Sequence, residues 1–157
     1  MKLIKKVVRV GNTGGVLVPR EWVRGTAEVI LIEKPIDIEA DVLSIIKPLL
    51  SEVKGIYLVG SYSRGDQTAR SDVDILVVTE KTNKKIHNGK YQIILISQKD
   101  LQNQLYYNAI PLLPMIKEAK PLLNAELIRP YKQAKLTKRN LHWYLETTHS
   151  ALNIIKT

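Results

Sequence analysis

The chain has 157 residues, 45% hydrophobic and 25% charged, which is the composition of an average soluble globular protein. No apolar run approaches the roughly 20 residues of a membrane-spanning helix, and no apolar region with a cleavage site follows the basic start, so neither a membrane segment nor a signal peptide is expected. Cysteine is absent, which excludes disulfides, thiolate catalysis and zinc–thiolate sites. A cytoplasmic protein is the simplest expectation.

The net charge of +9 is distributed unevenly along the chain. Residues 1–34 carry seven Lys or Arg against three acids, residues 35–116 carry nine of each, and residues 117–157 carry eight against three. Two basic segments therefore flank a neutral middle that holds most of the carboxylates. This asymmetry favours a polyanionic partner such as nucleic acid, or an acidic protein, with a merely basic solvated surface as the alternative.

The first 34 residues form a β-rich pattern. Strands are expected at 5–10, 16–18 and 27–32, with a Gly- and Asn-rich turn at 11–15 and a single helical turn that starts near Pro19. Three strands and one turn of this length cannot bury an adequate core, so a homodimer is expected.

The stretch KVVRVGNTGGVLVPREW resembles the swapped-hairpin domain of AbrB/MazE/SpoVT-type regulators. That resemblance implies an intertwined homodimer that binds DNA through its basic hairpin, with a generic β-hairpin as the alternative. The residues at the positions of the implied DNA contacts are Lys5, Lys6, Arg9, Asn12 and Arg20.

A change of character follows at Pro35. Apolar residues at helical spacing predict an amphipathic helix over 37–53, with Asp37 in its first turn and Pro48 expected to kink or shorten it. Residues 56–59 then form a short apolar run that is typical of a buried strand.

The most informative motif begins directly after that strand. Gly60-Ser61 should open a helix, and its backbone N–H groups and hydroxyl suit a phosphate. Ten residues later, Asp72 and Asp74 alternate with Val73, so both carboxylates point to one face of the following strand. Paired carboxylates of this kind can hold Mg²⁺ ions that bridge phosphate oxygens.

The spacing G-S-x10-D-x-D resembles the signature of the minimal nucleotidyltransferases of the DNA polymerase β superfamily, over approximately residues 36–100. The resemblance implies a mixed sheet with flanking helices, and ATP or another NTP as the substrate. It places nucleotide binding at Gly60, Ser61, Arg64 and Gly65, the last two being the family's R-G, and catalysis and Mg²⁺ at Asp72 and Asp74. It also implies an antitoxin-like role, in which such enzymes modify a partner HEPN ribonuclease.

One departure concerns catalysis. The superfamily places a third carboxylate on a neighbouring strand, expected here at 91–96, but no Asp or Glu occurs between Glu80 and Asp100. Gln92 is the amide residue available there, and an amide cannot accept a proton at neutral pH. His87 is a weaker candidate base, because residues 79–90 are expected to form a mobile, solvated loop.

The remainder of the chain, residues 101–157, is expected to be a helical extension. Ser97 should cap its first helix, Asn124 a helix over 125–135 and Thr137 the last helix. Apolar residues of the last helix repeat at helical spacing up to Leu152 and Ile155. Aromatic and histidine side chains there favour packing over stacking on bases or metal binding.

These patterns predict three segments. Residues 1–34 form an AbrB-like hairpin element, 35–100 an α/β nucleotidyltransferase domain with a mixed sheet, and 101–157 a helical extension. The leading hypothesis is Mg²⁺-dependent transfer of an NMP from an NTP to a protein or RNA acceptor. The alternative is a DNA-binding regulator or partner-binding protein whose nucleotidyltransferase domain is catalytically impaired.

Overall fold

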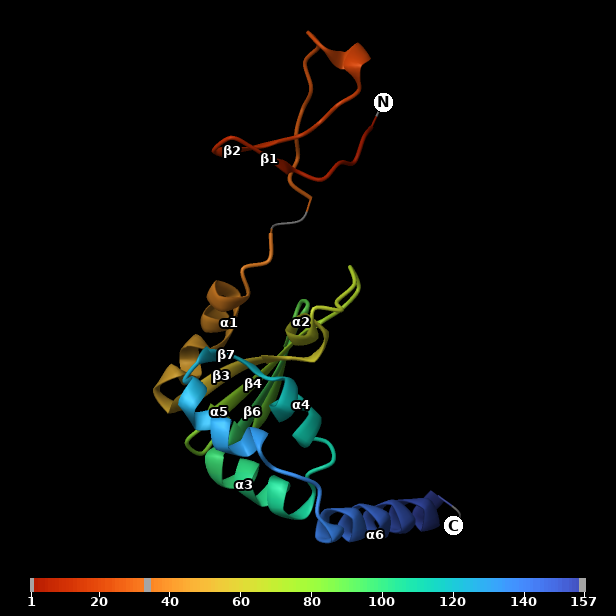
Figure 1. Cartoon of the computed structure of the whole chain (residues 1–157). Coiled ribbons are helices and arrows are strands. Elements are labelled where there is room, and N and C mark those ends of the chain that lie inside the picture. The colour runs from red at the N-terminus through yellow and green to blue at the C-terminus, as the bar shows by residue number, and fades with distance from the viewer. Residues whose placement is uncertain (1, 33–34, 156–157) are drawn as a thin grey trace. The chain divides into compact units, whose positions relative to one another are not determined.

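The computed structural model describes residues 2–32 and 35–155, with the side chains of the last helix described as far as Ala151. The chain divides into two compact units, Met1–Pro35 and Ile36–Thr157 (Figure 1). The division falls at the proline where the charge pattern changes.

The N-terminal unit contains one small hairpin. Strands β1 (Val8–Val10) and β2 (Thr13–Gly15) pair antiparallel, and a single 3₁₀ turn, η1 (Arg20–Trp22), follows Pro19 as expected. The predicted position of the second strand is wrong. Thr13 pairs directly with Val10, so the second strand lies within the segment that was predicted to be the turn. No strand forms at 16–18 or 27–32, since within this unit those segments have no strand to pair with.

The described part of the N-terminal unit has no buried side chain. Its aliphatic residues lie in water instead, and Ile4, Val29 and Ile30 are each about 70% exposed (72%, 72% and 71%). Exposure of so many large apolar groups is unfavourable for an isolated segment. The unit therefore lacks a core of its own.

The C-terminal unit is built on a five-stranded mixed sheet. Its strands, in spatial order, are β5 (Lys84–Asn88), β6 (Tyr91–Ser97), β4 (Val73–Thr79), β3 (Val53–Val59) and β7 (Lys120–Leu123). The central pair β4 and β6 is parallel, and every other neighbouring pair is antiparallel. The expected mixed sheet with flanking helices is confirmed.

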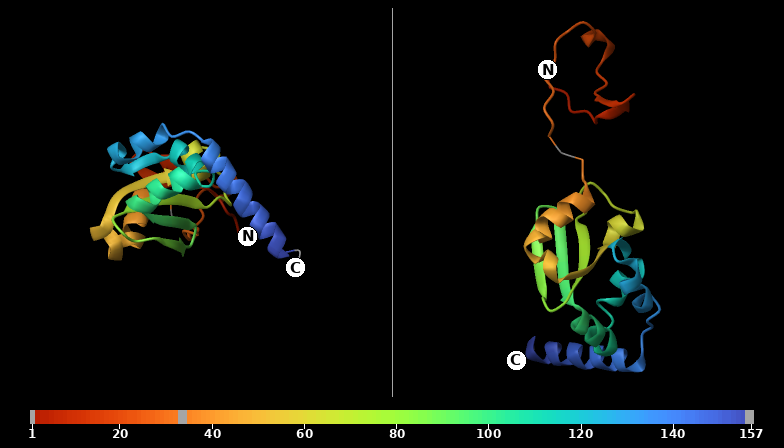
Figure 2. Two further views of the ribbon diagram at one scale, coloured as in Figure 1. Left: turned by 90° about the horizontal axis from the view of Figure 1, so that it is seen from below. Right: turned by 90° about the vertical axis from the view of Figure 1, so that its left-hand side faces the viewer.

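One face of this sheet is covered by the first helix, α1 (Ile38–Ile46), and the 3₁₀ segment η2 (Lys47–Glu52) (Figure 2). Asp37 caps α1 by accepting a hydrogen bond from the Ala40 N–H at 3.1 Å, and Pro48 shortens the helix as predicted. The α1 residues Val42 and Ile46 are fully buried against the strands.

The other face is covered by α3 (Gln98–Tyr107), α4 (Leu113–Glu118) and α5 (Ala125–Lys132). Ser97 caps α3 and Asn124 caps α5 through their side-chain oxygens, as expected. The fully buried Tyr57 lies in this core and donates its hydroxyl to the Asn124 carbonyl at 2.8 Å. Burial, with a smaller contribution from Tyr131, raises the pKa of Tyr57 to about 12.

Two strands correct the sequence prediction. Residues 79–90 are not simply a loop, because Lys84–Asn88 forms the edge strand β5 in a hairpin with β6. Residues 101–157 are not purely helical, because β7 pairs with β3. Both strands lie at sheet edges, and β7 contains Pro121, so their local patterns are too polar or too interrupted to identify without the sheet.

The last helix, α6 (Lys138–Ile155), extends away from α3 (Figure 1). Thr137 caps it by accepting from the N–H of the buried Asn140, as predicted. Arg139 anchors its first turn with the guanidinium 4.0 Å from the Tyr106 ring centre. The predicted apolar positions Leu152 and Ile155 lie outside the described side chains. Within the described residues, no helix has the length and apolarity to cross a bilayer.

Candidate active site

The residues of the G-S-x10-D-x-D motif meet at one edge of the large sheet. Strand β3 ends at Val59, where α2 (Gly60–Arg64) begins, as predicted. Val59 is the register partner of Asp74 on the antiparallel strand β4, and Asp74 is in turn the partner of Gln92 on the parallel strand β6. The strand connections therefore bring one glycine, one acid and one amide side by side.

Asp72 and Asp74 lie on the same side of β4, as the alternation predicts. Asp72 is exposed and directly precedes the strand, whereas Asp74 is half-buried. The Asp74 carboxylate packs against Gly60, where a Cβ atom would collide with Asp74 Oδ2. Gly60 also has a φ of +68°, so both its backbone and its missing side chain are needed at this position.

Gln92 occupies the position of the expected third carboxylate. Its amide Nε2 donates a hydrogen bond to Asp72 Oδ2 at 2.7 Å. Its neighbour Ile93 is 1% exposed and packs in the core on the opposite face of the sheet. The sequence alone did not show which face of the strand Gln92 occupies. In the structure Gln92 faces the two aspartates.

Glu118, at the end of α4, is a functional candidate that the sequence did not reveal. Its Oε1 accepts the Gly60 N–H at 2.7 Å, and its Oε2 accepts from Arg64 Nη1 at 2.6 Å. Its backbone carbonyl accepts the hydroxyl of the buried Ser63. Glu118 therefore fastens α2 to α4 from 58 residues away, and no local motif signals such a long-range contact.

The electrostatics of the site centre on Asp74. Burial raises the pKa of the Asp74 carboxyl, and the negative charges of Asp72 and Glu118 raise it further, while the nearby Arg64 cation lowers it. The ionised form of Asp74 is thus disfavoured in the free protein. A bound cation would relieve this repulsion.

The predicted nucleotide-binding residues all lie on or beside α2. Ser61 is half-buried in its first turn, and Gly65 ends the helix with a left-handed φ of +83°. Arg64 is held by two carboxylates, with its Nε 3.1 Å from Asp66 Oδ2 and its Nη1 2.6 Å from Glu118 Oε2. Its guanidinium is therefore committed in part to fixing the end of α2.

The donor set at this edge suits Mg²⁺, which prefers hard oxygen ligands. Asp72 and Asp74 would hold the ion, and the raised pKa of Asp74 marks a site where positive charge is favourable. Bound there, the ion would neutralise charge on a triphosphate. Within residues 2–32 and 35–155, no group of three or more His, Cys, Asp or Glu could hold a metal, in keeping with the amide at the third position.

His87 lies much closer to these residues than the sequence suggested. It belongs to β5, where it is the register partner of Gln92, and its side chain is exposed. His87 and Gln92 therefore share one face of the sheet.

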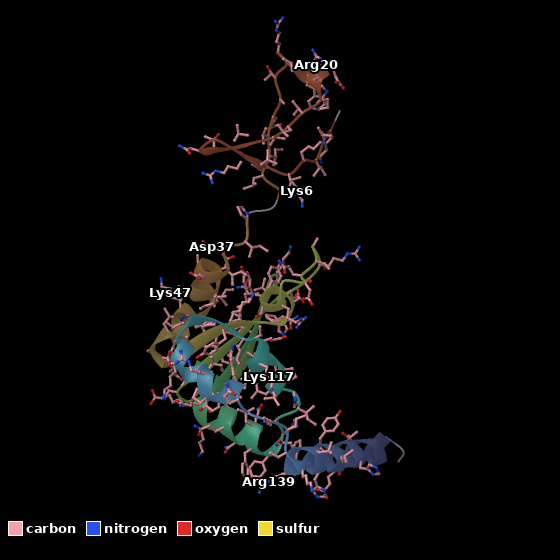
Figure 3. All side chains as sticks on the ribbon, in the orientation of Figure 1. Lys6, Arg20, Asp37, Lys47, Lys117 and Arg139 are labelled. Atoms are coloured by element: carbon pink, nitrogen blue, oxygen red, sulfur yellow. The ribbon has the colours of Figure 1, made fainter. Side chains whose placement is uncertain are left out.

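The predicted DNA-binding residues lie on the N-terminal unit, and all five are exposed. Lys6 and Arg20 lie at different ends of this unit (Figure 3). Arg9 donates its Nε to the Gly11 carbonyl at 3.0 Å and so stabilises the β1–β2 turn.

The sequence pattern of the nucleotidyltransferase domain family matches residues 40–139, which include α2, the paired aspartates, Gln92 and Glu118. That match spans well over half of the chain, and the chain belongs to this family. No protein of curated function matches it.

Three solved structures are similar to the chain. A nucleotidyltransferase-like protein from Exiguobacterium sibiricum is 20% identical, with a TM-score of 0.45, over 61% of this chain and 37% of that protein. A toxin–antitoxin with AMP-PNP is 17% identical, with a TM-score of 0.42, over 76% and 96% of the two chains. A mutant of the toxin–antitoxin MntA–HpeT is 15% identical, with a TM-score of 0.39, over 75% and 95%. The family assignment rests on the match over residues 40–139.

Proposed function

We propose that this protein transfers a nucleotidyl group from ATP or another NTP, with Mg²⁺, to a hydroxyl of a protein or RNA acceptor. The observation that carries the proposal is the pair of carboxylates at the start of β4, Asp72 and Asp74, with Asp74 packed against the glycine that opens α2. In this family-wide arrangement the acids would hold Mg²⁺ beside the phosphates. Ser61 and the backbone of α2 would contact the phosphates themselves.

Arg64, Gly65 and Glu118 have supporting roles in this proposal. Gly65 ends α2, and the Glu118 carboxylate joins the first N–H of α2 to the guanidinium at its end. Because both carboxylate oxygens are engaged, the helix is held in place before a nucleotide arrives. Such preorganisation reduces the cost of ordering the site on binding.

The test is transfer of radioactivity from ATP labelled at the α-phosphate to macromolecules of a dialysed cell extract. Wild-type protein should label protein or RNA when Mg²⁺ is present, and the Asp74→Asn variant should not. Equal labelling by both proteins would contradict the assignment of Asp74.

We also propose a helical protein partner and an antitoxin role, as the resemblance to minimal nucleotidyltransferases implies. The exposed apolar residues of α6 support such a partner: Leu141 is 55% exposed, Trp143 38%, Tyr144 42% and Leu145 53%. Co-expression with the product of the neighbouring gene should give a stable complex if that gene encodes a HEPN ribonuclease. Replacement of Leu141 and Leu145 by Ser should weaken the complex.

The second candidate function is a DNA-binding, homodimeric regulator. Two observations favour it: an amide, Gln92, stands where the resemblance implies a third acid, and the N-terminal unit has exposed basic side chains and no core of its own. A second copy of the unit would cover its apolar residues. Duplex DNA should then bind with a steep salt dependence, because released counterions drive the association. DNA binding without label transfer would favour this function over the first.

A further inference from the structure

Apart from Asp72 and Asp74, which are assigned to Mg²⁺, the described site has no carboxylate free to take a proton from an acceptor hydroxyl. Strand β6 carries no Asp or Glu, and the Gln92 amide already donates to Asp72. Glu118 does not supply the group either, because its carboxylate oxygens accept from Gly60 and Arg64. A positioned general base commonly contributes 10²–10⁴ in rate, so its location matters for transfer.

The register places an imidazole in line with the aspartates. Asp74 on β4 pairs with Gln92 on β6, and Gln92 pairs with His87 on β5. Directly opposed residues lie on the same face with their Cβ atoms about 5 Å apart. His87 is thus two strand spacings, about 10 Å, from Asp74. His87 lies on the edge strand next to Gln92, the residue at the position where the resemblance implies a third acid.

His87 is accessible from solvent at one edge of the sheet. β5 is the edge strand, and the His87 side chain is exposed. The next pair on the same face, Lys85 and Ile94, lines a cavity of about 690 Å³ that continues between the sheet and the residues of α3 and α4. The His87–Gln92 pair lies directly beyond this lining, at an exposed edge that an acceptor hydroxyl can reach.

We propose that His87 is the general base of the nucleotidyl transfer, a proposal that rests on the function proposed above. An unprotonated imidazole nitrogen takes the proton of the acceptor hydroxyl while the acceptor oxygen forms a bond to the α-phosphorus. The bond from that phosphorus to the oxygen bridging to the β-phosphate breaks, and pyrophosphate leaves with the electron pair. The imidazolium then releases its proton to solvent.

The charged groups near His87 come from two strands. Lys85 lies on the same face of β5, and Asp72 and Asp74 lie beyond the neutral Gln92. An uncharged residue therefore separates both acids from the imidazole.

The experiment uses the full chain, Mg²⁺, ATP labelled at the α-phosphate and dialysed total cell extract as the source of acceptors. The measured rate is that of the label transfer which Asp74→Asn abolishes, compared between variants at one neutral pH. The variants are His87→Ala and, as the matched control, His149→Ala, whose exposed imidazole lies on α6. ATP with Mg²⁺ should raise the melting temperature of both variants as it does for wild type, which separates nucleotide binding from proton transfer.

The proposal predicts that His87→Ala lowers the rate at least about 100-fold. Free imidazole should restore part of the rate, an effect that a structural role would not produce. The His149→Ala rate should equal that of wild type. A His87→Ala rate within threefold of wild type would overturn the proposal. Wild type that binds ATP without transferring label overturns it too, whereas wild type that binds no ATP removes the proposed function itself.

Discussion

The two units of this protein differ in whether their aliphatic side chains are buried. In the C-terminal unit, helices cover both faces of the sheet, and residues such as Ile75 and Leu76 are fully buried. In the N-terminal unit, aliphatic residues of the same kind lie in water, as Ile30 does at 71% exposure. The C-terminal unit can therefore fold alone, while the N-terminal unit needs a partner surface to cover its apolar residues. The proposed chemistry belongs to the C-terminal unit, and assembly is expected of the N-terminal unit.

Deletion of residues 1–34 is the strongest test of this difference. Because these residues add no buried side chain to the described structure, the shortened chain should keep its fold and its melting temperature. It should lose dimerisation completely, because the apolar surface that favours self-association is gone. Light scattering of the full and shortened chains measures both masses. An unchanged assembly after the deletion would show that the N-terminal unit does not hold the copies together.

The next largest effect is expected at Gln92. Gln92→Glu places a carboxylate on the face that holds Asp72 and Asp74, so in a His87→Ala background it should raise label transfer by about 10²–10⁴. Ile93→Asp is the control, because Ile93 is buried on the opposite face and a charge there should cost folding instead. If Gln92→Glu leaves the rate of label transfer in the His87→Ala variant unchanged, the lack of a base does not limit that rate.

The glycines at the two ends of α2, Gly60 and Gly65, allow a matched comparison of the cost of adding a Cβ atom. Gly60 and Gly65 both have positive φ, but an added Cβ would strike the Asp74 carboxylate only at Gly60, since nothing lies within 4 Å at Gly65. Gly65→Ala should cost about 1 kcal/mol of unfolding free energy from backbone strain, and Gly60→Ala should cost more, about 3 kcal/mol, and abolish nucleotide binding. Chemical denaturation with and without ATP measures both effects. Equal costs would contradict the packing of Asp74 on Gly60.

The smallest effect concerns stability without ligand. The pKa of Asp74 is raised in the folded state, so the folded protein binds this proton more tightly than the unfolded chain does. Stability contributed by the protonated form is then lost as the pH rises from below 3.8 through the raised pKa. Asp74→Asn should therefore raise the melting temperature at pH 7 and leave it unchanged near pH 3. A lower melting temperature at pH 7 would contradict this electrostatic account.

The sequence predicted, from its local elements, that the motif residues of the candidate site lie together. The motif positions Gly60, Asp72 and Asp74 are close in the chain, and strand alternation is sufficient to place both carboxylates on one face. The helix caps Ser97, Asn124 and Thr137 were also predictable, because a cap acts within one turn. The mixed sheet was predicted from the resemblance to the minimal nucleotidyltransferases, which the G-S-x10-D-x-D motif carries.

Other features depend on contacts between distant segments. Glu118 meets Gly60 only after α4 packs against α2, and His87 meets Gln92 only after β5 pairs with β6. β5 has the sequence of a solvated loop, since an edge strand needs few apolar residues. In the N-terminal unit the error has the opposite origin, because apolar segments were expected to pair where the unit offers no partner strand.

The measurement that tests the central claim most directly is a melting curve of the full chain with ATP and Mg²⁺. At a ligand concentration 100 times the Kd, binding to the folded state should add about 2.7 kcal/mol, enough to raise the melting temperature by several degrees. The account predicts this shift for wild type and its loss in Asp74→Asn, although the variant is the more stable protein without ligand. An unchanged melting temperature of wild type at millimolar ATP and Mg²⁺, or an equal shift in both proteins, would contradict the assignment of a nucleotide site to Asp72 and Asp74.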